Sequence, residues 1–373
     1  MTVGVAAAGT IAAVSKNSRL HDAIAAVIDP DLRRSLGELG LLREVGIDKS
    51  GVATVGIAVP SSNWDAAPVG RAIAAAAKSL EGVDAVQVDF AILEAAERAT
   101  LTTRLKSAAT VGGPGSKTRV IAVSSGKGGV GKSSVTTNTA VALARSGLDV
   151  AVIDADVWGY SIPRMLGIER PPQALEDLIV PPMAHGVRAI SMDFFVPTDG
   201  AVVWRGPMLH KALEQFLGDV FWDEPDFLLI DMPPGTGDVA ISISQFLPRS
   251  QTVVVTTPQP TAQRVAKRAA AMAAKVNQEV LGVIENMSWF TGDDGVRYQL
   301  FGSGGGASLA TELGVPLLGQ IPLVTAMREG ADQGLPVFVS APGSEAAEVF
   351  DAIAARIVDL RPRVRTHPEL IIR

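Results

Sequence analysis

The sequence predicts an α/β protein in which a mostly parallel sheet flanked by helices follows a small α/β domain. From residue 118 to 360, apolar runs typical of strands alternate with segments of helical periodicity, the order that an open parallel sheet requires. A chain of 373 residues is also long for a single domain. We therefore expect two domains, each with its own hydrophobic core.

The first domain is expected over residues 18–98, where helical and strand-like patterns follow one another closely. Asp29-Pro30-Asp31-Leu32 predicts a turn and a helix start. The other patterned stretches of this domain are helical near 20–28 and 64–80 and strand-like over 51–59 and 83–90. This order predicts a small α/β domain.

Three further segments are expected to lie outside the two domains. The stretch 99–117 ends in Gly112-Gly113-Pro114-Gly115-Ser116-Lys117, a composition typical of linkers. Residues 1–17 predict a flexible N-terminus. Residues 361–373 contain two prolines and predict an irregular tail. The second domain then covers residues 118–360.

The most informative stretch of the chain is a glycine-rich loop that begins at Ser125. It follows a β-branched apolar run and opens a helical pattern over 133–145, the context that a phosphate-binding P-loop requires. Its backbone N–H groups and the start of the helix favour phosphate. Lys132 can reach the β- and γ-phosphates, and the Ser133 hydroxyl can bind Mg²⁺. We expect ATP to be bound by Gly126, Lys127, Gly128, Gly129, Val130, Gly131, Lys132, Ser133 and Ser134.

Carboxylates follow two apolar strand patterns of the second domain. One strand ends in Asp154, with Asp156 two residues later, and the other ends in Asp231 as in a Walker B motif. Because parallel strands end at one edge of a sheet, these acids should lie near the phosphates. We expect Ser133, Asp154 and Asp231 to bind Mg²⁺, the two carboxylates through water. Either Asp154 or Asp156 alone is also compatible with capping the next segment, but two acids at one strand exit after a phosphate-binding loop favour a role at the site.

The loop after Asp231 is expected to sense the nucleotide. Two prolines stiffen it, whereas Gly235 and Gly237 let its backbone approach a γ-phosphate. A loop that contacts the γ-phosphate can adopt one shape with ATP and another with ADP. We therefore expect this loop to act as a switch.

Composition excludes several other classes of function. The chain has no cysteine, which excludes disulfides, thiolate metal sites and thiol nucleophiles. Its four histidines, His21, His185, His210 and His367, show no ligand spacing. The net charge of −6 argues against broad nucleic-acid binding, and no apolar run is long enough to span a membrane. The apolar N-terminus has no basic region before it, unlike a signal peptide. We expect a cytoplasmic protein with neither nucleic acid nor membrane as partner.

A second lysine in the loop, Lys127, makes the motif more specific. Lys-Gly-Gly-Val-Gly-Lys-Ser resembles the deviant Walker A loop of the MinD-like ATPases, which include nitrogenase iron protein, the ParA partition ATPases and the Mrp/ApbC proteins. The resemblance implies that Lys127 crosses a dimer interface and contacts the partner's nucleotide, in the manner of an arginine finger. It also implies that Asp156 positions the attacking water, so the catalytic residues are Lys127, Lys132 and Asp156 in a homodimer.

Further motifs resemble the Mrp/ApbC family of iron–sulfur cluster carriers. They are Asp154–Gly167, Trp204–Met208, Ile230–Asp238 and Gly282–Ser288. Residues 29–33 and 38–40 are similar to the MIP18-like (DUF59) domain often fused to these ATPases. The resemblance implies slow ATP hydrolysis with Mg²⁺, adenine recognition by Asn286, and a cluster held at the dimer interface and passed to apoproteins.

The chain departs from this family where the cluster would be held. Members commonly carry Cys-x-x-Cys shortly after the Asn-Met-Ser segment and a further cysteine after the second strand of the first domain. Here residues 289–295 and 59–64 contain none. Asp293 and Asp294 are hard oxygen ligands, unsuited to a cluster, and predict a solvated turn. We expect an intact ATPase that holds no iron–sulfur cluster by itself.

Three functions remain open from the sequence. The first is iron–sulfur protein maturation in which an unidentified client or scaffold protein supplies the thiolates. The second is an ATP-driven protein-interaction switch unrelated to clusters. The third, a spatial organiser on DNA or membrane, is disfavoured by the negative net charge and by prolines that interrupt the 361–373 tail.

Overall fold

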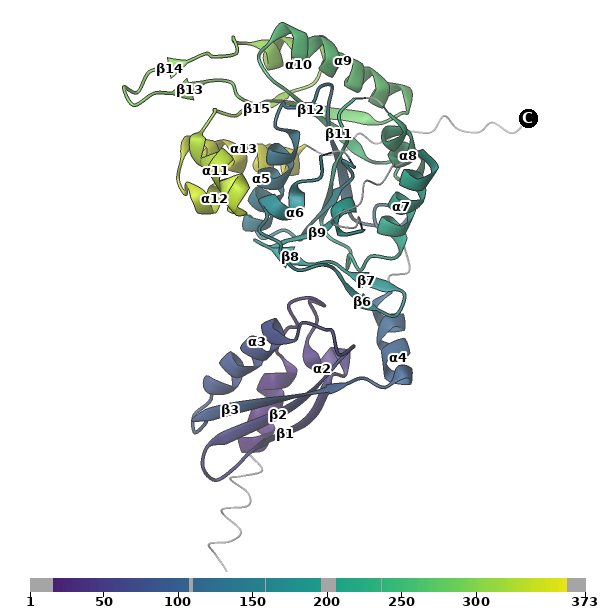
Figure 1. The fold of residues 1–373 in the computed structure, drawn as a ribbon, viewed down its shortest axis with the longest axis vertical. Coiled ribbons are helices and arrows are strands. Elements are labelled where there is room, and N and C mark those ends of the chain that lie inside the picture. Colours follow the sequence, from purple (N-terminus) through teal and green to yellow (C-terminus); the bar gives the residue numbers. More distant parts are fainter. Residues whose placement is uncertain (1–15, 107–109, 158, 196–205, 236, 361–373) are drawn as a thin grey trace, which may run out of the picture. The chain divides into compact units, whose positions relative to one another are not determined.

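The computed structural model describes residues 16–106, 110–157, 159–195, 206–235 and 237–360. These residues form two compact units, shown in Figure 1. Unit 1 comprises Met1–Lys106 and Gln173–Val180, and unit 2 comprises Ser107–Pro172 and Pro181–Arg373. The expected tail over 361–373 lies outside the described residues, as does the expected flexible N-terminus over 1–17 apart from residues 16 and 17, which begin a helix.

Unit 1 is built on a three-stranded sheet in the order β1-β2-β3. Strand β2 pairs antiparallel with β1 and parallel with β3. The strands are β1 Leu42–Ile47, β2 Val52–Val59 and β3 Ala85–Ile92, and the helices are residues 16–25, α2 Leu36–Leu39, α3 Ala67–Lys78 and α4 Ala95–Leu105. Strand β1 was not expected from the sequence, because a register shift between Leu42 and Val45 interrupts its side-chain alternation.

The turn at Asp29 forms as expected, but the helix after it begins several residues later. Asp29 Oδ1 accepts hydrogen bonds from the backbone N–H groups of Asp31 and Leu32, at 2.9 and 2.8 Å. Helix α2 starts only after Ser35, which forms a capping box with Glu38. The aspartate therefore closes a turn, and the serine begins the helix.

Two elements of unit 1 differ from the expected boundaries. Helix α4 extends to Leu105, so the first part of the stretch expected as a linker is helical. A hairpin of β6 Gln173–Leu175 and β7 Leu178–Val180 lies within the sequence of the expected second domain but belongs to unit 1. Three of its apolar side chains are buried: Leu175, Leu178 and Val180.

Unit 2 contains an eight-stranded sheet in the order β15-β12-β11-β4-β10-β5-β9-β8. Its strands are parallel except β8, which runs antiparallel to β9. The strands are β4 Arg119–Ser125, β5 Val150–Asp154, β8 Met183–Ala184, β9 Val187–Ser191, β10 Phe227–Asp231, β11 Gln251–Thr256, β12 Glu279–Glu285 and β15 Leu317–Gln320. The central strands β4 and β10 are those whose ends carry the glycine loop and Asp231.

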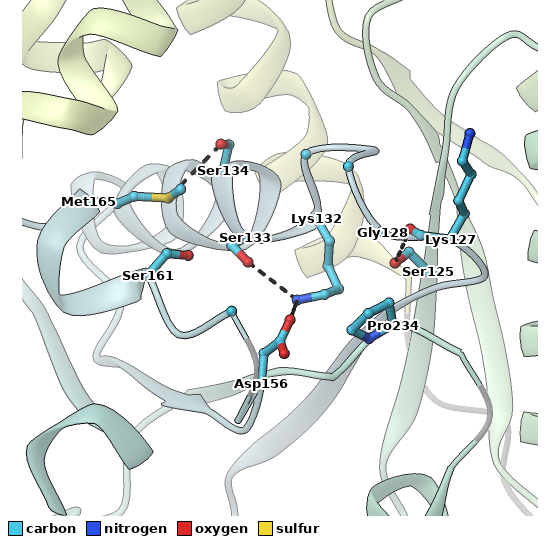
Figure 2. A pocket seen from close by; sticks show the side chains of 13 residues that line it. Ser125, Lys127, Gly128, Lys132, Ser133, Ser134, Asp156, Ser161, Met165 and Pro234 are labelled. Carbon is cyan, nitrogen blue, oxygen red and sulfur yellow. Dashed lines mark hydrogen bonds and ion pairs between the residues drawn. The ribbon is translucent and has the colours of Figure 1, made fainter. Parts of the chain in front are cut away.

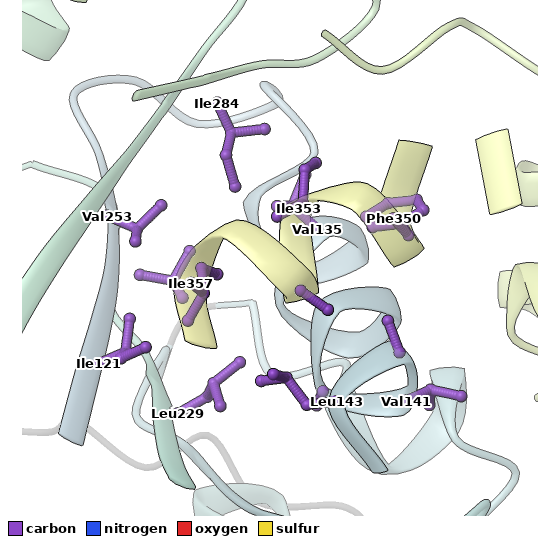
Figure 3. Packing of buried hydrophobic residues seen from close by; sticks show 14 of the residues in the cluster. Ile121, Val135, Val141, Leu143, Leu229, Val253, Ile284, Phe350, Ile353 and Ile357 are labelled. Atoms are coloured by element: carbon purple, nitrogen blue, oxygen red, sulfur yellow. The ribbon is translucent and has the colours of Figure 1, made fainter. Parts of the chain in front are cut away.

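Helices cover both faces of this sheet. On one face α5 and α13 pack together over the sheet, and Figure 3 shows their buried side chains meeting Val253 and Ile284. On the other face α9 and α10 bury Val254 and Val283. The helices are α5 Lys132–Arg145, α6 Ile162–Met165, α7 Gly206–Gly218, α8 Asp238–Phe246, α9 Pro260–Lys275, α10 Gly305–Leu313, α11 Thr325–Gln333, α12 Val337–Ser340 and α13 Glu345–Asp359, with a 3₁₀ turn η1 at Met192–Phe195.

Neighbouring residues of β11 and β12 thus face opposite layers, as the pleat of a strand requires.

A separate hairpin, β13 Phe290–Thr291 and β14 Arg297–Tyr298, follows β12. No helix in the described part of the chain is long and apolar enough to cross a membrane.

Candidate active site

The glycine loop connects β4 to α5, and two of its glycines are required by close contacts. A Cβ on Gly131, whose φ is +77°, would lie 2.3 Å from the side-chain nitrogen of Asn286. A Cβ on Gly126 would lie 2.2 Å from the backbone carbon of Val265 in α9. Both distances are far below van der Waals contact, so only glycine lets the loop fold this closely against its neighbours. Helix α5 then begins at Lys132.

A cavity of about 350 Å³ opens above this loop (Figure 2). It is lined by Ser125, Lys127, Gly128, Gly129, Gly131, Lys132, Ser133, Ser134, Asp156, Gly159, Ser161, Met165 and Pro234. Most of the expected ATP-binding loop therefore lies at one cavity, together with Asp156. The expected residues outside its lining are Gly126, Val130, Asp154, Asp231, Gly235 and Asn286.

Lys132 lies among acidic and hydroxyl groups at the base of the cavity. Its Nζ is 2.6 Å from Asp231 Oδ2 and 3.6 Å from Asp156 Oδ2, and it donates to Ser133 Oγ at 3.3 Å. The lysine is only 6% exposed and Asp231 is fully buried. A buried cation is stable only beside compensating charge, which the two carboxylates supply.

Asp231 also receives two hydroxyl groups from α5. Ser133 Oγ donates to Asp231 Oδ2, and Thr136 Oγ1 donates to Asp231 Oδ1, both at 2.6 Å. Thr136 was missed in the sequence, although it lies one helical turn after Lys132 and so shares its face. The carboxylate is thereby fixed against the start of α5.

Asp154 is oriented towards the segment that follows it. One of its oxygens accepts hydrogen bonds from the backbone N–H groups of Ser161 and Ile162, at 3.0 and 3.1 Å, and from Ser191 Oγ at 3.2 Å. Burial and, second, the charge of Asp231 raise the pKa of Asp154 to about 7, against the lowering effect of those backbone bonds. The capping role left open by the sequence is therefore observed for Asp154.

Lys127 differs from Lys132 in its surroundings. It is exposed, and Figure 2 shows its amino group pointing away from Lys132 and Asp156. In the described part of the chain no hydrogen bond or ion pair to this amino group is found. Its amino group is therefore turned away from the groups at the base of the cavity.

A comparison with known families decides which kind of P-loop protein this is. Residues 116–358 match the ParA model, described as the NUBPL iron-transfer P-loop NTPase. The chain belongs to this P-loop NTPase family. Residues 17–90 match a second model, described as an iron–sulfur cluster assembly protein. The resemblance inferred from the motifs and the α/β P-loop fold are thus both confirmed.

Curated relatives of this NTPase match nearly the whole chain. A protein of Mycobacterium leprae named iron–sulfur cluster carrier protein is 42% identical over 360 residues, 92% of this chain and 94% of its own. One of the same name from Deinococcus radiodurans is 42% identical, over 95% of this chain and 98% of its own. Among solved structures, a nucleotide-binding protein of Archaeoglobus fulgidus in complex with ADP is 34% identical with a TM-score of 0.54, over 62% of this chain and 91% of that chain.

Two expected residues of this NTPase connect loops rather than line the cavity. The Gly235 N–H donates to the Ser125 carbonyl at 3.0 Å. Asn286 Nδ2 donates to the Val130 carbonyl at 2.9 Å, and the asparagine is buried. Thr236 and Trp158, which belong to the matched motifs, lie outside the described residues, as do Trp204 and Arg205.

The segment in place of the family's cysteine pair is a short hairpin. Asp294 Oδ1 accepts from the Val296 N–H at 3.0 Å, and Tyr298 donates to Asp294 Oδ2 at 2.7 Å. The tyrosine hydroxyl is the main cause that lowers the pKa of Asp294. Asp294 therefore closes a turn, as expected. Among the described residues no cluster of three or more histidine, aspartate or glutamate side chains is placed to hold a metal ion.

Proposed function

We propose that this NTPase binds MgATP at residues 126–134, hydrolyses it slowly, and uses the cycle in iron–sulfur protein maturation. One observation supports the first part above all others. Lys132 follows the glycine loop as the first residue of α5, and its amino group lies within 4 Å of both Asp156 and Asp231. Phosphoryl transfer requires a lysine, a magnesium-binding acid and a water-orienting acid, and here Lys132 is close to one candidate for each acid.

The oxygen groups around Asp231 fit a magnesium ion. The hydroxyl of Ser133 and the carboxylate of Asp231 are hard ligands already in contact at 2.6 Å, with Asp154 at the end of the adjacent strand. Bound Mg²⁺ neutralises charge on the β- and γ-phosphates. We infer that the Lys132 amino group leaves Asp231 for the phosphates when nucleotide binds, since Asp231 and the phosphates compete for this amino group.

Hydrolysis requires a water aligned with the γ-phosphorus. Its oxygen bonds to phosphorus as the bond to the ADP oxygen breaks, and the proton passes to the phosphate product or solvent. We assign the alignment of this water to Asp156, because its side chain lines the cavity and contacts Lys132. Lys127 would add charge from a second copy, for which its exposed amino group is suited. Adenine recognition by Asn286 is part of the same proposal.

The proposed cargo is an iron–sulfur cluster, as the names of the curated relatives indicate. Clusters are held by thiolates, and this chain has no cysteine. We infer that a client or scaffold protein supplies the thiolates while this chain supplies the ATP-driven conformational cycle. The same lack of cysteine favours a second candidate, an ATP-driven protein-interaction switch that never handles a cluster.

Lys132→Ala tests nucleotide binding. Without this amino group the phosphate charges lose their main cation, so MgATP affinity should fall at least about 100-fold. Lys117→Ala removes one exposed positive charge near the start of the same unit and should leave the affinity unchanged. Because Lys132→Ala leaves Asp231 without its cation, circular dichroism must first show that the variant is folded. A folded variant that binds MgATP like the wild type would refute the proposed site.

A cluster assay separates the two candidates. Anaerobic reconstitution of the chain alone with iron and sulfide, followed by desalting, should leave no stoichiometric visible absorption. Repeating it with a cysteine-containing iron–sulfur apoprotein, with and without MgATP, should show ATP-dependent cluster delivery if the chain acts in maturation. Delivery unaffected by the chain would favour the protein-interaction switch. A chelator-resistant cluster on the chain alone would show that the missing cysteines are not required.

A further inference from the structure

Glu285, the last residue of β12, is a fully buried carboxylate surrounded by hydrogen-bond donors. Its Oε1 accepts from Ser288 Oγ at 2.9 Å and from Gln320 Nε2 at 2.8 Å. Its other oxygen accepts from the Gly306 N–H. No lysine or arginine of the described ranges forms an ion pair with it. Burying a polar group is costly unless it is hydrogen-bonded, and the bonds that satisfy Glu285 link it to the segments around it.

The three donors come from three different elements at the carboxyl edge of the sheet. Gly306 lies in the first turn of α10, where the helix end favours a negative charge. A Cβ on Gly306 would lie 2.6 Å from Glu285 Cβ, so the helix approaches this closely only because the residue is glycine. Gln320 ends β15, and Ser288 ends the turn after β12. Glu285 therefore joins β12, β15 and α10 at one point.

The turn that Glu285 holds carries Asn286 against the phosphate-binding loop. The Asn286 backbone N–H bonds to the Thr256 carbonyl at 2.8 Å, and its Oδ1 accepts from the Met287 N–H at 3.0 Å. Met287 has a φ of +58°, a left-handed conformation that is unfavourable for a non-glycine residue. From this turn the Asn286 amide reaches the Val130 carbonyl, beside Gly131.

We propose that Glu285 is a positioning residue of the nucleotide site. It holds the 286–288 turn in place, so that Asn286 fixes the Val130 carbonyl and keeps the neighbouring N–H groups of the loop directed at the phosphates. The inference rests on the proposed function, because it concerns the same nucleotide site. It assigns to Glu285 an action through Asn286, not a contact with nucleotide.

A double-mutant cycle with MgADP as the probe tests this action in the full chain. Glu285→Gln replaces one carboxylate oxygen by an NH₂ group. This group cannot accept a hydrogen bond from the donors that face it, so the substitution disturbs the turn at nearly constant volume. Glu285→Gln and Asn286→Ala should each weaken MgADP binding about tenfold by titration calorimetry, the loss of roughly one hydrogen bond. The double variant should also be about tenfold weaker, because the two residues act through one contact.

The matched control is Glu279→Gln, the same substitution at the opposite end of β12. Glu279 accepts a hydrogen bond from Gln251 Nε2 at 3.0 Å. Its substitution should leave the affinity for MgADP unchanged. If Glu285→Gln does not fold, Gln320→Ala removes one donor of the same carboxylate and replaces it in the cycle. Gln320→Ala should weaken MgADP binding less than Glu285→Gln. Combined with Asn286→Ala, it should weaken binding no further than Asn286→Ala alone.

Two results would overturn the inference. One is MgADP affinity that stays at the wild-type value while Glu285→Gln lowers only the melting temperature, since that describes a purely structural residue. The other is a double variant about 100-fold weaker, since independent effects multiply. A wild-type chain that binds no MgADP would instead refute the proposed function itself.

Discussion

At the scale of single residues, the glycine loop is restricted most at its first glycine. A Cβ on Gly126 would meet the backbone of Val265 and Ala266 at 2.2–2.4 Å, whereas a Cβ on Gly128 would meet no atom within 4 Å. Backbone atoms of α9 cannot move aside as a flexible side chain can. The loop is therefore held by packing at Gly126 and is sterically open at Gly128.

This contrast gives a prediction for substitutions at Gly126 and Gly128. Gly126→Ala should lower the free energy of unfolding by about 1–3 kcal/mol or more, because the added methyl group overpacks the contact with α9. Gly128→Ala is the matched control and should change it by less than about 0.5 kcal/mol. Denaturant unfolding without nucleotide measures both. Equal destabilisation by the two variants would contradict the contact.

The hydroxyl of Thr136 is the second residue-level case. Thr136→Val keeps the shape but leaves Asp231 Oδ1 with one donor fewer in a fully buried position. We expect a loss of about 1–3 kcal/mol in unfolding free energy, as for other unsatisfied buried groups. Thr311→Val, at an exposed site of α10 whose hydroxyl bonds to the Ala307 carbonyl, should have little effect. Thermal denaturation of both variants decides; similar melting temperatures would argue against the role of Thr136.

The sequence predicted part of this geometry. The motifs placed Lys132, Ser133 and Asp231 on elements whose ends must meet, because parallel strands share one edge. They did not predict that Lys132 contacts Asp231 directly, and they left open which aspartate, Asp154 or Asp156, caps the segment that follows. These contacts depend on side-chain directions in the folded loop, for which motif spacing carries no information.

At the scale of elements, the β6–β7 hairpin is the feature least evident from the sequence. It lies inside the range matched by the P-loop NTPase model, yet its contacts are with unit 1. Gln173 accepts from the Asp65 N–H at 2.6 Å and donates to Asp31 at 3.2 Å, and Glu176 pairs with Arg98 at 2.8 Å. Strands of three residues show no periodicity, and partners more than 70 residues away leave no local pattern.

The hairpin should therefore contribute to the stability of unit 1. Leu175 is fully buried, and Leu175→Ala should lower the stability of unit 1 by about 2–5 kcal/mol. Hydrogen exchange should become faster in residues 29–36 and 95–105, while the strands of unit 2 keep their protection. Ala174→Ser, on an exposed position of the same strand, is the control. Faster exchange confined to unit 2 would mean that the hairpin belongs with the NTPase unit.

Longer elements were predicted well because their patterns repeat. The buried apolar runs of β4 and β10 and the alanine-rich α3 have the length and spacing that mark strand and helix. Strand β1 was missed because its polar Arg43 and Glu44 and its shifted register obscure the alternation. An element could be predicted from the sequence when its apolar pattern was long and regular, and composition mattered less.

At the scale of the whole molecule, the position of Lys127 bears on whether one copy is sufficient for catalysis. Its amino group points away from the cavity, whereas Lys132 and Asp156 face it (Figure 2). We propose that Lys127 supplies charge for the transferring phosphoryl group across an interface with a second copy. If a second copy supplies it, each cavity combines Asp156 of one chain with Lys127 of the other.

Mixing two inactive variants tests this arrangement. Lys127→Ala and Asp156→Ala should each bind MgATP but lose turnover. After equal mixing, half of the dimers contain one of each, and one of their two sites has both an intact Asp156 and an intact Lys127 from the other chain. Turnover should thus recover to roughly a quarter of the wild-type value. Mixing Lys132→Ala with Asp156→Ala is the control, because a lysine that acts only in its own chain restores far less. If mixed dimers form, as shown by native mass spectrometry, and no activity returns, Lys127 does not act across the interface.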